Sequence, residues 1–162
     1  MTVASAFNTP VESGLRVLIL LTAANPRAVG LNTLVLWDHA LLHSADLGGP
    51  PSAHPALPLR ATQLSVKRGD LDGGLRVMMR AGLVELVVDV NGLQYRATET
   101  GPRYLDLLQA DYVGLLRTRA AWVVDSLGGI EDESELRALM TQAVGRWSAD
   151  FSGDFEQAGG EL

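Results

Sequence analysis

The stretch DLDGGLRVMMRAGLVELVVDVNGLQYRATETG, residues 70–101, decides the fold. It predicts a helix over Leu71–Ala81 and then a β-hairpin made of Leu83–Val90 and Leu93–Ala97. Asn91-Gly92 between the strands is a strong hairpin signal, because both positions of such a turn need φ > 0. A helix followed by a short hairpin and another helix is typical of a winged helix. In this interpretation Leu71–Ala81 is the second helix of a helix-turn-helix and the hairpin is the wing.

The segments before this stretch are predicted to be helical. Thr9 is expected to cap a helix over Pro10–Ala24. Its apolar residues leave little room for a solvent-exposed face, so the helix is either central to the core or buried by a partner, and we prefer the core. A second helix is expected over Leu31–His43, where the dipole favours an imidazolium in the last turn. Arg60–Arg68 is predicted to be the first helix of the helix-turn-helix, with the turn at Gly69-Asp70.

Further helices are predicted after the hairpin. One starts near Thr98, Asp111–Leu127 forms a longer one, and the last runs to about Trp147. The expected fold class is therefore mainly α with a small β-hairpin, a winged helix-turn-helix with N- and C-terminal helical extensions. We expect one domain over residues 1–148 and an acidic, disordered tail over 149–162.

Composition limits the class of protein. The 162 residues are 47% hydrophobic and include no cysteine, which fits a globular domain without disulfides or thiolate sites. No leader-like segment and no membrane-length apolar run is present, so we expect a cytoplasmic protein that does not enter a membrane. The net charge is −6, and an acidic chain is a poor default for a free-standing DNA binder, whose affinity comes from neutralising phosphates.

Basic residues are nevertheless in excess between Arg60 and Arg80. Arg76 and Arg80 lie four residues apart and are expected on the outer face of the predicted second helix. The candidate nucleic-acid contacts are Lys67, Arg68, Arg76 and Arg80. Arginines on a helix are as readily explained as solvated surface, so the sequence leaves both interpretations open.

Four prolines make Ser44–Leu59 an irregular but stiff loop with no regular element. His43, Asp46 and His54 do not have the spacing of an established zinc motif, and helix capping with loop hydrogen bonds explains them better. The sequence contains no phosphate-binding glycine loop and no hydrolase or metalloprotease motif. We therefore expect no metal, no cofactor and no catalytic residue.

Three stretches together resemble one protein family. NTPVESGLRVLILLTAANP (8–26), HSADLGGPPSAHPALPLR (43–60) and YRATETG (95–101) are similar to the middle component of bacterial ABC three-component systems, the type-2 middle component in particular. The most specific part of the resemblance is the HSxDxGGPPSxHPxxPxR pattern. Its residues here are His43, Ser44, Asp46, Gly48, Gly49, Pro50, Pro51, Ser52, His54, Pro55, Pro58 and Arg60.

The resemblance implies a small winged-helix protein encoded between an effector and an ATPase of the SMC/Rad50 class, in systems that act against phage or plasmids. No catalytic residue comes with it. A middle component would use its surfaces to bind the ATPase or the effector. The possible partner-binding loop comprises His43, Asp46, Gly48, Gly49, Pro50, Pro51, His54, Pro55 and Arg60.

Two functions from different classes follow. The first is a non-catalytic adaptor between the ATPase and the effector. Such an adaptor could form a homodimer through Asp111–Leu127, and it could reach DNA through the complex. The second is an autonomous winged-helix transcriptional regulator with Arg76 and Arg80 in the major groove. An enzyme that uses His43, Asp46 and His54 is a third, weaker interpretation.

Overall fold

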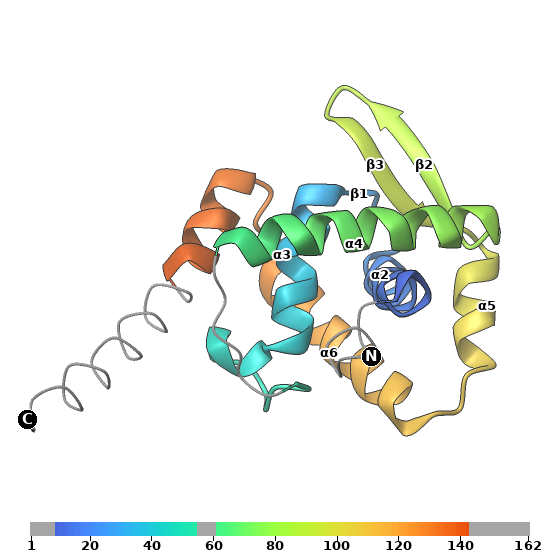
Figure 1. Ribbon diagram of the computed structural model, residues 1–162, viewed down its shortest axis with the longest axis horizontal. Coiled ribbons are helices and arrows are strands. Elements are labelled where there is room, and N and C mark those ends of the chain that lie inside the picture. Colours follow the sequence, from blue (N-terminus) through green and yellow to red (C-terminus); the bar gives the residue numbers. More distant parts are fainter. Residues whose placement is uncertain (1–8, 55–60, 143–162) are drawn as a thin grey trace, which may run out of the picture.

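The computed structural model describes residues 9–54 and 61–142. Helices α2, α3, α4 and α6 and a small sheet make up most of the fold, and α2 is seen almost end-on beneath α4 in Figure 1. A further helical segment covers residues 133–142. The elements in chain order are α2 (Pro10–Ala24), β1 (Val29–Gly30), α3 (Leu31–Leu42), the 3₁₀ helix η1 (Ser44–Leu47), α4 (Ala61–Arg80), β2 (Val84–Asp89), β3 (Gly92–Ala97), α5 (Thr100–Asp106) and α6 (Asp111–Leu127).

The predicted first helix is confirmed, and it lies at the centre of the core. The side chain of Thr9 accepts a hydrogen bond from the backbone N–H of Glu12 at 3.3 Å, as expected of an N-cap. Every residue from Val17 to Leu21 is buried. The helix is enclosed because α4 and α6 pack on it from two sides, so its apolar surface is explained within the chain.

The small sheet has the strand order β1-β3-β2 and is antiparallel throughout. We call the β2–β3 hairpin the wing, and in Figure 1 it rises from one side of α4. The predicted turn is wrong by one position: Asp89 pairs with Gly92, so Val90 and Asn91 form the turn. Oδ1 of Asp89 accepts a hydrogen bond from the backbone N–H of Asn91 at 2.7 Å. Among residues 89–92, only Gly92 has a positive φ, of 95°. An aspartate side chain that closes the turn makes a second positive φ unnecessary.

The predicted division of 60–81 into two helices is also wrong. Residues 61–80 form the single helix α4, and Gly69-Asp70 lies inside it. Leu71 and Leu75 are fully buried, so the packing of this face keeps the helix continuous through its glycines. The first helix of the helix-turn-helix is therefore α3, and the wing follows α4 directly, which keeps the fold winged-helix-like.

Gly74 has a packing role that the sequence does not reveal. At the crossing of α2 and α4, a Cβ on Gly74 would lie 2.4 Å from the backbone nitrogen of Gly14. A Cβ on Gly14 would lie 2.7 Å from the carbonyl oxygen of Gly74. The two glycines therefore let the helix backbones touch, whereas a Cβ on Gly73 would meet open space.

The C-terminal helices are separate elements. α5 ends at Asp106 and α6 begins at Asp111, so the two are not continuous. The last predicted helix is confirmed over 133–142, whereas its expected end at Trp147 and the tail over 149–162 lie outside the described residues. Leu136 and Met140 of this segment are buried and add to the core.

The glycine pair gives a test of the α2–α4 crossing. We expect Gly74→Ala to lower the free energy of unfolding by about 1–3 kcal/mol or more, because the methyl group must push two backbones apart. Gly73→Ala is the matched control, and it should raise stability by up to about 1 kcal/mol through helix propensity alone. Urea unfolding followed by circular dichroism measures both. Equal effects of the two variants would contradict the close crossing.

Candidate functional site

A buried carboxylate joins three helices. Asp38 of α3 is fully buried, and its Oδ1 accepts a hydrogen bond from Nε of Arg16 in α2 at 2.8 Å. Its Oδ2 accepts one from Nζ of Lys67 in α4 at 2.9 Å. Burial by itself would raise the pKa of Asp38, but the charges of Lys67 and Arg16 outweigh it and lower that pKa to about 2. Asp38 is therefore ionised across the physiological range, and we call Arg16, Asp38 and Lys67 the polar centre.

All three histidines lie in one row beside the polar centre. The ring centroids of His39 and His43 are 4.9 Å apart, and those of His43 and His54 are 6.5 Å apart. Nε2 of His54 lies 2.5 Å from the hydroxyl of Tyr112 in α6. Burial and then the charge of Lys67 lower the pKa of His39 to about 3 and that of His43 to about 4. The expected imidazolium at His43 is therefore wrong, because burial outweighs the helix dipole.

The described part of the proline-rich loop, residues 44–54, folds back on the domain. η1 replaces the first part of the predicted irregular stretch, and Oγ of Ser44 donates a hydrogen bond to the carbonyl of Pro50 at 2.8 Å. Nε of Arg119 in α6 donates to the carbonyl of Pro51 at 3.2 Å. A Cβ on Gly49 would lie 2.3 Å from the ring of Trp122, so glycine permits this contact. The loop is thus held in a defined shape.

The structure places most of the possible partner-binding loop. The rings of His43 and His54 are nearly perpendicular, at 86°, and Oδ2 of Asp46 lies 3.8 Å from Nε2 of His39. Gly48, Gly49, Pro50 and Pro51 form the turn after η1. Pro55 and Arg60 lie outside the described residues. Within the described ranges, no group of three or more histidine, aspartate or glutamate side chains is arranged to hold a metal ion.

The four candidate nucleic-acid contacts do not form one patch. Lys67 points inward to Asp38, and only 16% of its side chain is exposed. Arg68 donates a hydrogen bond to Oδ1 of Asn32. Arg76 forms an exposed ion pair with Asp72 at 3.2 Å, and Arg80 is exposed at the end of α4. Arg76 and Arg80 therefore remain on the outer surface, whereas Lys67 has a structural partner.

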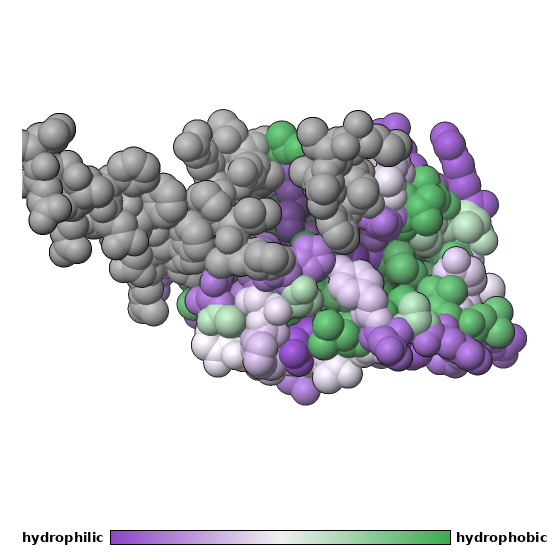
Figure 2. Space-filling model, turned by 60° about the horizontal axis from the view of Figure 1, so that its bottom comes forward, coloured by the Kyte–Doolittle hydropathy of each residue, from purple (hydrophilic) through white to green (hydrophobic). Residues whose placement is uncertain are grey.

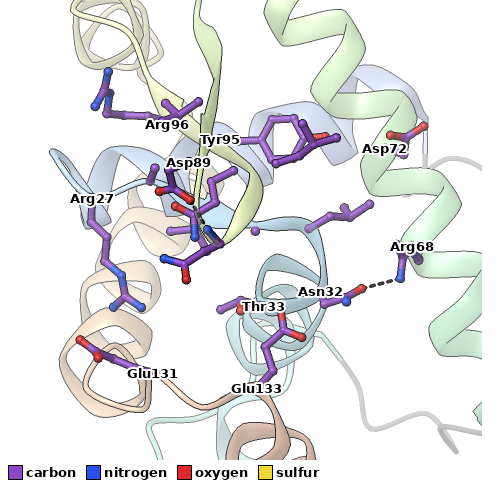
Figure 3. Close-up of a pocket in the computed structure, with 18 residues that line it drawn as sticks. Arg27, Asn32, Thr33, Arg68, Asp72, Asp89, Tyr95, Arg96, Glu131 and Glu133 are labelled. Carbon is purple, nitrogen blue, oxygen red and sulfur yellow. Dashed lines mark hydrogen bonds between the residues drawn. The ribbon is translucent and has the colours of Figure 1, made fainter.

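An open groove of about 1130 Å³ lies between the wing, the start of α3, the middle of α4 and residues 131–133. Figure 3 shows Tyr95 directed towards α4, with Arg96 on the opposite side of the hairpin. The charged residues that line the groove are Arg27, Arg68, Arg96, Asp72, Asp89, Glu131 and Glu133. Because these charges are of both signs, the groove is not a continuous basic channel for a phosphate backbone.

Exposed apolar side chains gather on two separate surfaces. The first is the wing, where Leu86, Val88, Val90 and Leu93 are all exposed. The second lies on the side formed by α5 and the beginning of α6, where Figure 2 shows hydrophobic residues at the surface. The exposed large apolar residues of these two elements are Tyr104 and Leu107 at α5 and its end, and Tyr112 and Leu115 at the beginning of α6. Apolar patches of this kind mark sites of contact with other proteins.

The polar centre was missed by sequence analysis apart from Lys67. Arg16 interrupts the apolar run of the first helix, and Asp38 interrupts that of the second. A single charge within an otherwise buried helix needs a partner of opposite sign, since an unpaired buried charge is costly. That rule identifies both residues as members of buried ion pairs, although it does not say which partners they have.

The comparisons with known proteins give one match. The family model described as ABC-three component (ABC-3C) system Middle Component 2 matches residues 6–150. No curated protein and no solved structure matches the chain. In the described part of the chain, no helix is both long enough and apolar enough to cross a membrane.

Removing the central carboxylate should be strongly destabilising. We expect Asp38→Ala to lower the free energy of unfolding by about 3–5 kcal/mol, because the buried Arg16 and the largely buried Lys67 lose their shared anion. Asp106→Ala removes the exposed Asp106–Arg117 pair and is the control, with an expected loss of at most about 1 kcal/mol. Chemical denaturation of both variants measures the difference. A loss for Asp38→Ala as small as that of the control would contradict the role given to the polar centre.

The buried histidines predict a dependence of stability on pH. Their pKa values are lower in the folded chain than the ordinary value of 6.5, so the unfolded chain binds more protons between about pH 4 and 6.5. Stability is then fully present above pH 6.5 and falls below it, by about 1.4 kcal/mol per pH unit for each histidine. Urea unfolding at pH 7.5, 6.5, 5.5 and 4.5 should show this slope. The double variant His39→Asn with His43→Asn should have a flatter slope, and an unchanged slope would refute the assignment.

Proposed function

Since the chain belongs to the ABC-three component system Middle Component 2 family, we propose that it is a non-catalytic winged-helix adaptor. In this role it links an SMC/Rad50-like ATPase to an effector subunit in a prokaryotic system that acts against phage or plasmids. The chain would work in the cytoplasm by binding other subunits, without a cofactor. The observation that carries the proposal is the chemistry of the wing.

A wing that contacts DNA needs cationic side chains to neutralise phosphates. Here the exposed side chains of the wing are mainly aliphatic, and Val88 and Val90 are 70% and 100% exposed. The charged residues of the wing are two acids, Glu85 and Asp89, and Arg96, which is paired with Glu85 at 2.8 Å. This surface suits a protein partner better than a nucleic acid.

An adaptor also needs a second place to bind. The apolar surface on α5 and the start of α6 is separate from the wing. The loop over 44–54 is held by hydrogen bonds to α6 and by the Gly49–Trp122 contact, so binding there would not have to order it first. The α6 surface could instead pair two copies of the chain, as the sequence suggested.

The polar residues supply little for catalysis. Asp38 is held by ion pairs with Arg16 and Lys67, and His39 and His43 are buried and neutral. These groups stabilise the contact of the helices with the loop and are not displayed in a cleft for a substrate. The proposal of a non-catalytic subunit is based on this arrangement.

One observation favours the alternative function of an autonomous transcriptional regulator. Arg76 and Arg80 are exposed on α4, the helix that directly precedes the wing. In that role they would enter the major groove of a palindromic site. Asp72 already pairs with Arg76, so this surface is weaker than an unopposed basic helix.

Co-purification tests the adaptor proposal. The tagged chain is expressed with the proteins encoded beside it, and we expect an ATPase or effector to elute with it in a fixed ratio on size exclusion. The same purified chain, tested alone, should show little sequence-specific DNA binding. Elution alone as a dimer that binds a palindrome would favour the regulator, provided that Arg76→Glu with Arg80→Glu lowers both the affinity and its dependence on salt.

A further inference from the structure

We propose that the outer edge of β2 is a docking site for an extended segment of a partner subunit, which adds to the sheet as a fourth strand. The segment would alternate apolar residues with basic ones. This inference depends on the proposed adaptor function and specifies one of its contacts. It concerns Val84–Asp89 and the exposed apolar side chains of the wing.

β2 is the last strand of the sheet on its side. The strand order is β1-β3-β2, so β3 covers one edge of β2, and no described strand covers the other. In Figure 1 β2 is the outermost strand of the hairpin. A free edge offers a row of backbone donors and acceptors to which another chain can bind.

Proteins usually protect such an edge with a bulge, a proline or a lysine. The pairing of β2 with β3 runs without a bulge from Val84↔Ala97 to Asp89↔Gly92. The sequence of β2, VELVVD, contains no proline, glycine, lysine or arginine. The only charged side chains of β2 are the acids Glu85 and Asp89, which oppose an acidic strand but favour a basic one, so this regular edge is suited to a basic partner segment.

The hydrogen-bond pattern identifies the free backbone groups. The N–H of Thr98 donates to the carbonyl of Leu83 at 3.0 Å, so these two residues form a hydrogen-bonded pair. Bonded and non-bonded pairs alternate along an antiparallel ladder. Leu86 and Val88 are therefore in non-bonded pairs, and their N–H and C=O groups point to the free edge.

The side chains give the chemistry of the occupant. Leu86 and Val88 lie on one face of β2, and Leu93 is directly opposite Val88 on β3, while Val90 is exposed in the turn that follows. Glu85, Val87 and Asp89 lie on the other face, where Glu85 also pairs with Arg96 of β3 at 2.8 Å. An added strand would therefore match both faces if it alternates apolar residues with lysine or arginine.

A second copy of the chain fits this edge less well. Two copies of β2 could pair antiparallel with Val87 opposite Val87, which keeps their apolar side chains on the same face. In that pairing Glu85 of each copy lies opposite Asp89 of the other, and the like charges repel. The protein also carries a net charge of −6, which opposes self-association. A basic and apolar segment of another subunit has neither disadvantage.

The test removes one outward backbone donor. Val88→Pro deletes an N–H that points away from β3, and proline is tolerated at such edge positions. Val88→Thr is the matched control, because it keeps the N–H and the branched side chain. Both are made in the full chain, checked by melting temperature, and compared for binding to the co-purifying subunits. Leu86→Lys with Val88→Lys is a second variant, which keeps both amides and repels a basic strand.

We expect Val88→Pro and the double lysine variant to weaken binding at least tenfold, and Val88→Thr to stay within threefold of the unchanged chain. Hydrogen exchange at Leu86 and Val88 should be slow in the complex and fast in the chain alone. Unchanged binding of Val88→Pro with fast exchange in the complex would overturn this inference and leave the adaptor intact. Slow exchange in a homodimer would assign the edge to a second copy, and failure of the unchanged chain to bind any subunit would overturn both proposals.

Discussion

The rest of the structure depends on the charge of Asp38. Its carboxylate lies in the core between three helices, and its two cationic partners come from the first helix of the domain and from α4. A buried ion pair adds little net stability relative to a well-packed apolar contact, but an incomplete one is very unfavourable. The arrangement therefore penalises any packing of α2, α3 and α4 in which one of these side chains lacks the others. It fixes the helices that carry the wing and the loop.

This constraint explains why some elements could be predicted from the sequence and others could not. The first helix was predictable because Thr9, Pro10 and the residues up to Ala24 carry local signals for its start and end. The hairpin was predictable for the same reason, although its turn moved by one residue when Asp89 supplied the hydrogen bond. The continuity of α4 was not predictable from local sequence, where glycines disfavour a helix. Gly74 is needed for a contact with Gly14, which is distant in sequence.

The candidate site shows the same limit. Arg76 and Arg80 are four residues apart and so share one face of α4, and both are exposed as the sequence predicted. Lys67 belongs to the same basic segment, yet it points into the core, because its partner Asp38 lies 29 positions away in the sequence. The motif of the proline-rich loop identified the family, but the contact between Gly49 and Trp122 that shapes the loop joins two distant segments. Local patterns thus predict elements, whereas burial decides which charged side chains reach the surface.

The uninterrupted course of α4 has a mechanical consequence. A helix of 20 residues is about 30 Å long and bends little. One end of it holds Lys67 in the polar centre beside the loop, and the other leads directly into the wing. Between these two ends the backbone of the helix touches that of α2, where Gly74 crosses Gly14. A single continuous element therefore sets the position of the wing relative to the polar centre and the loop.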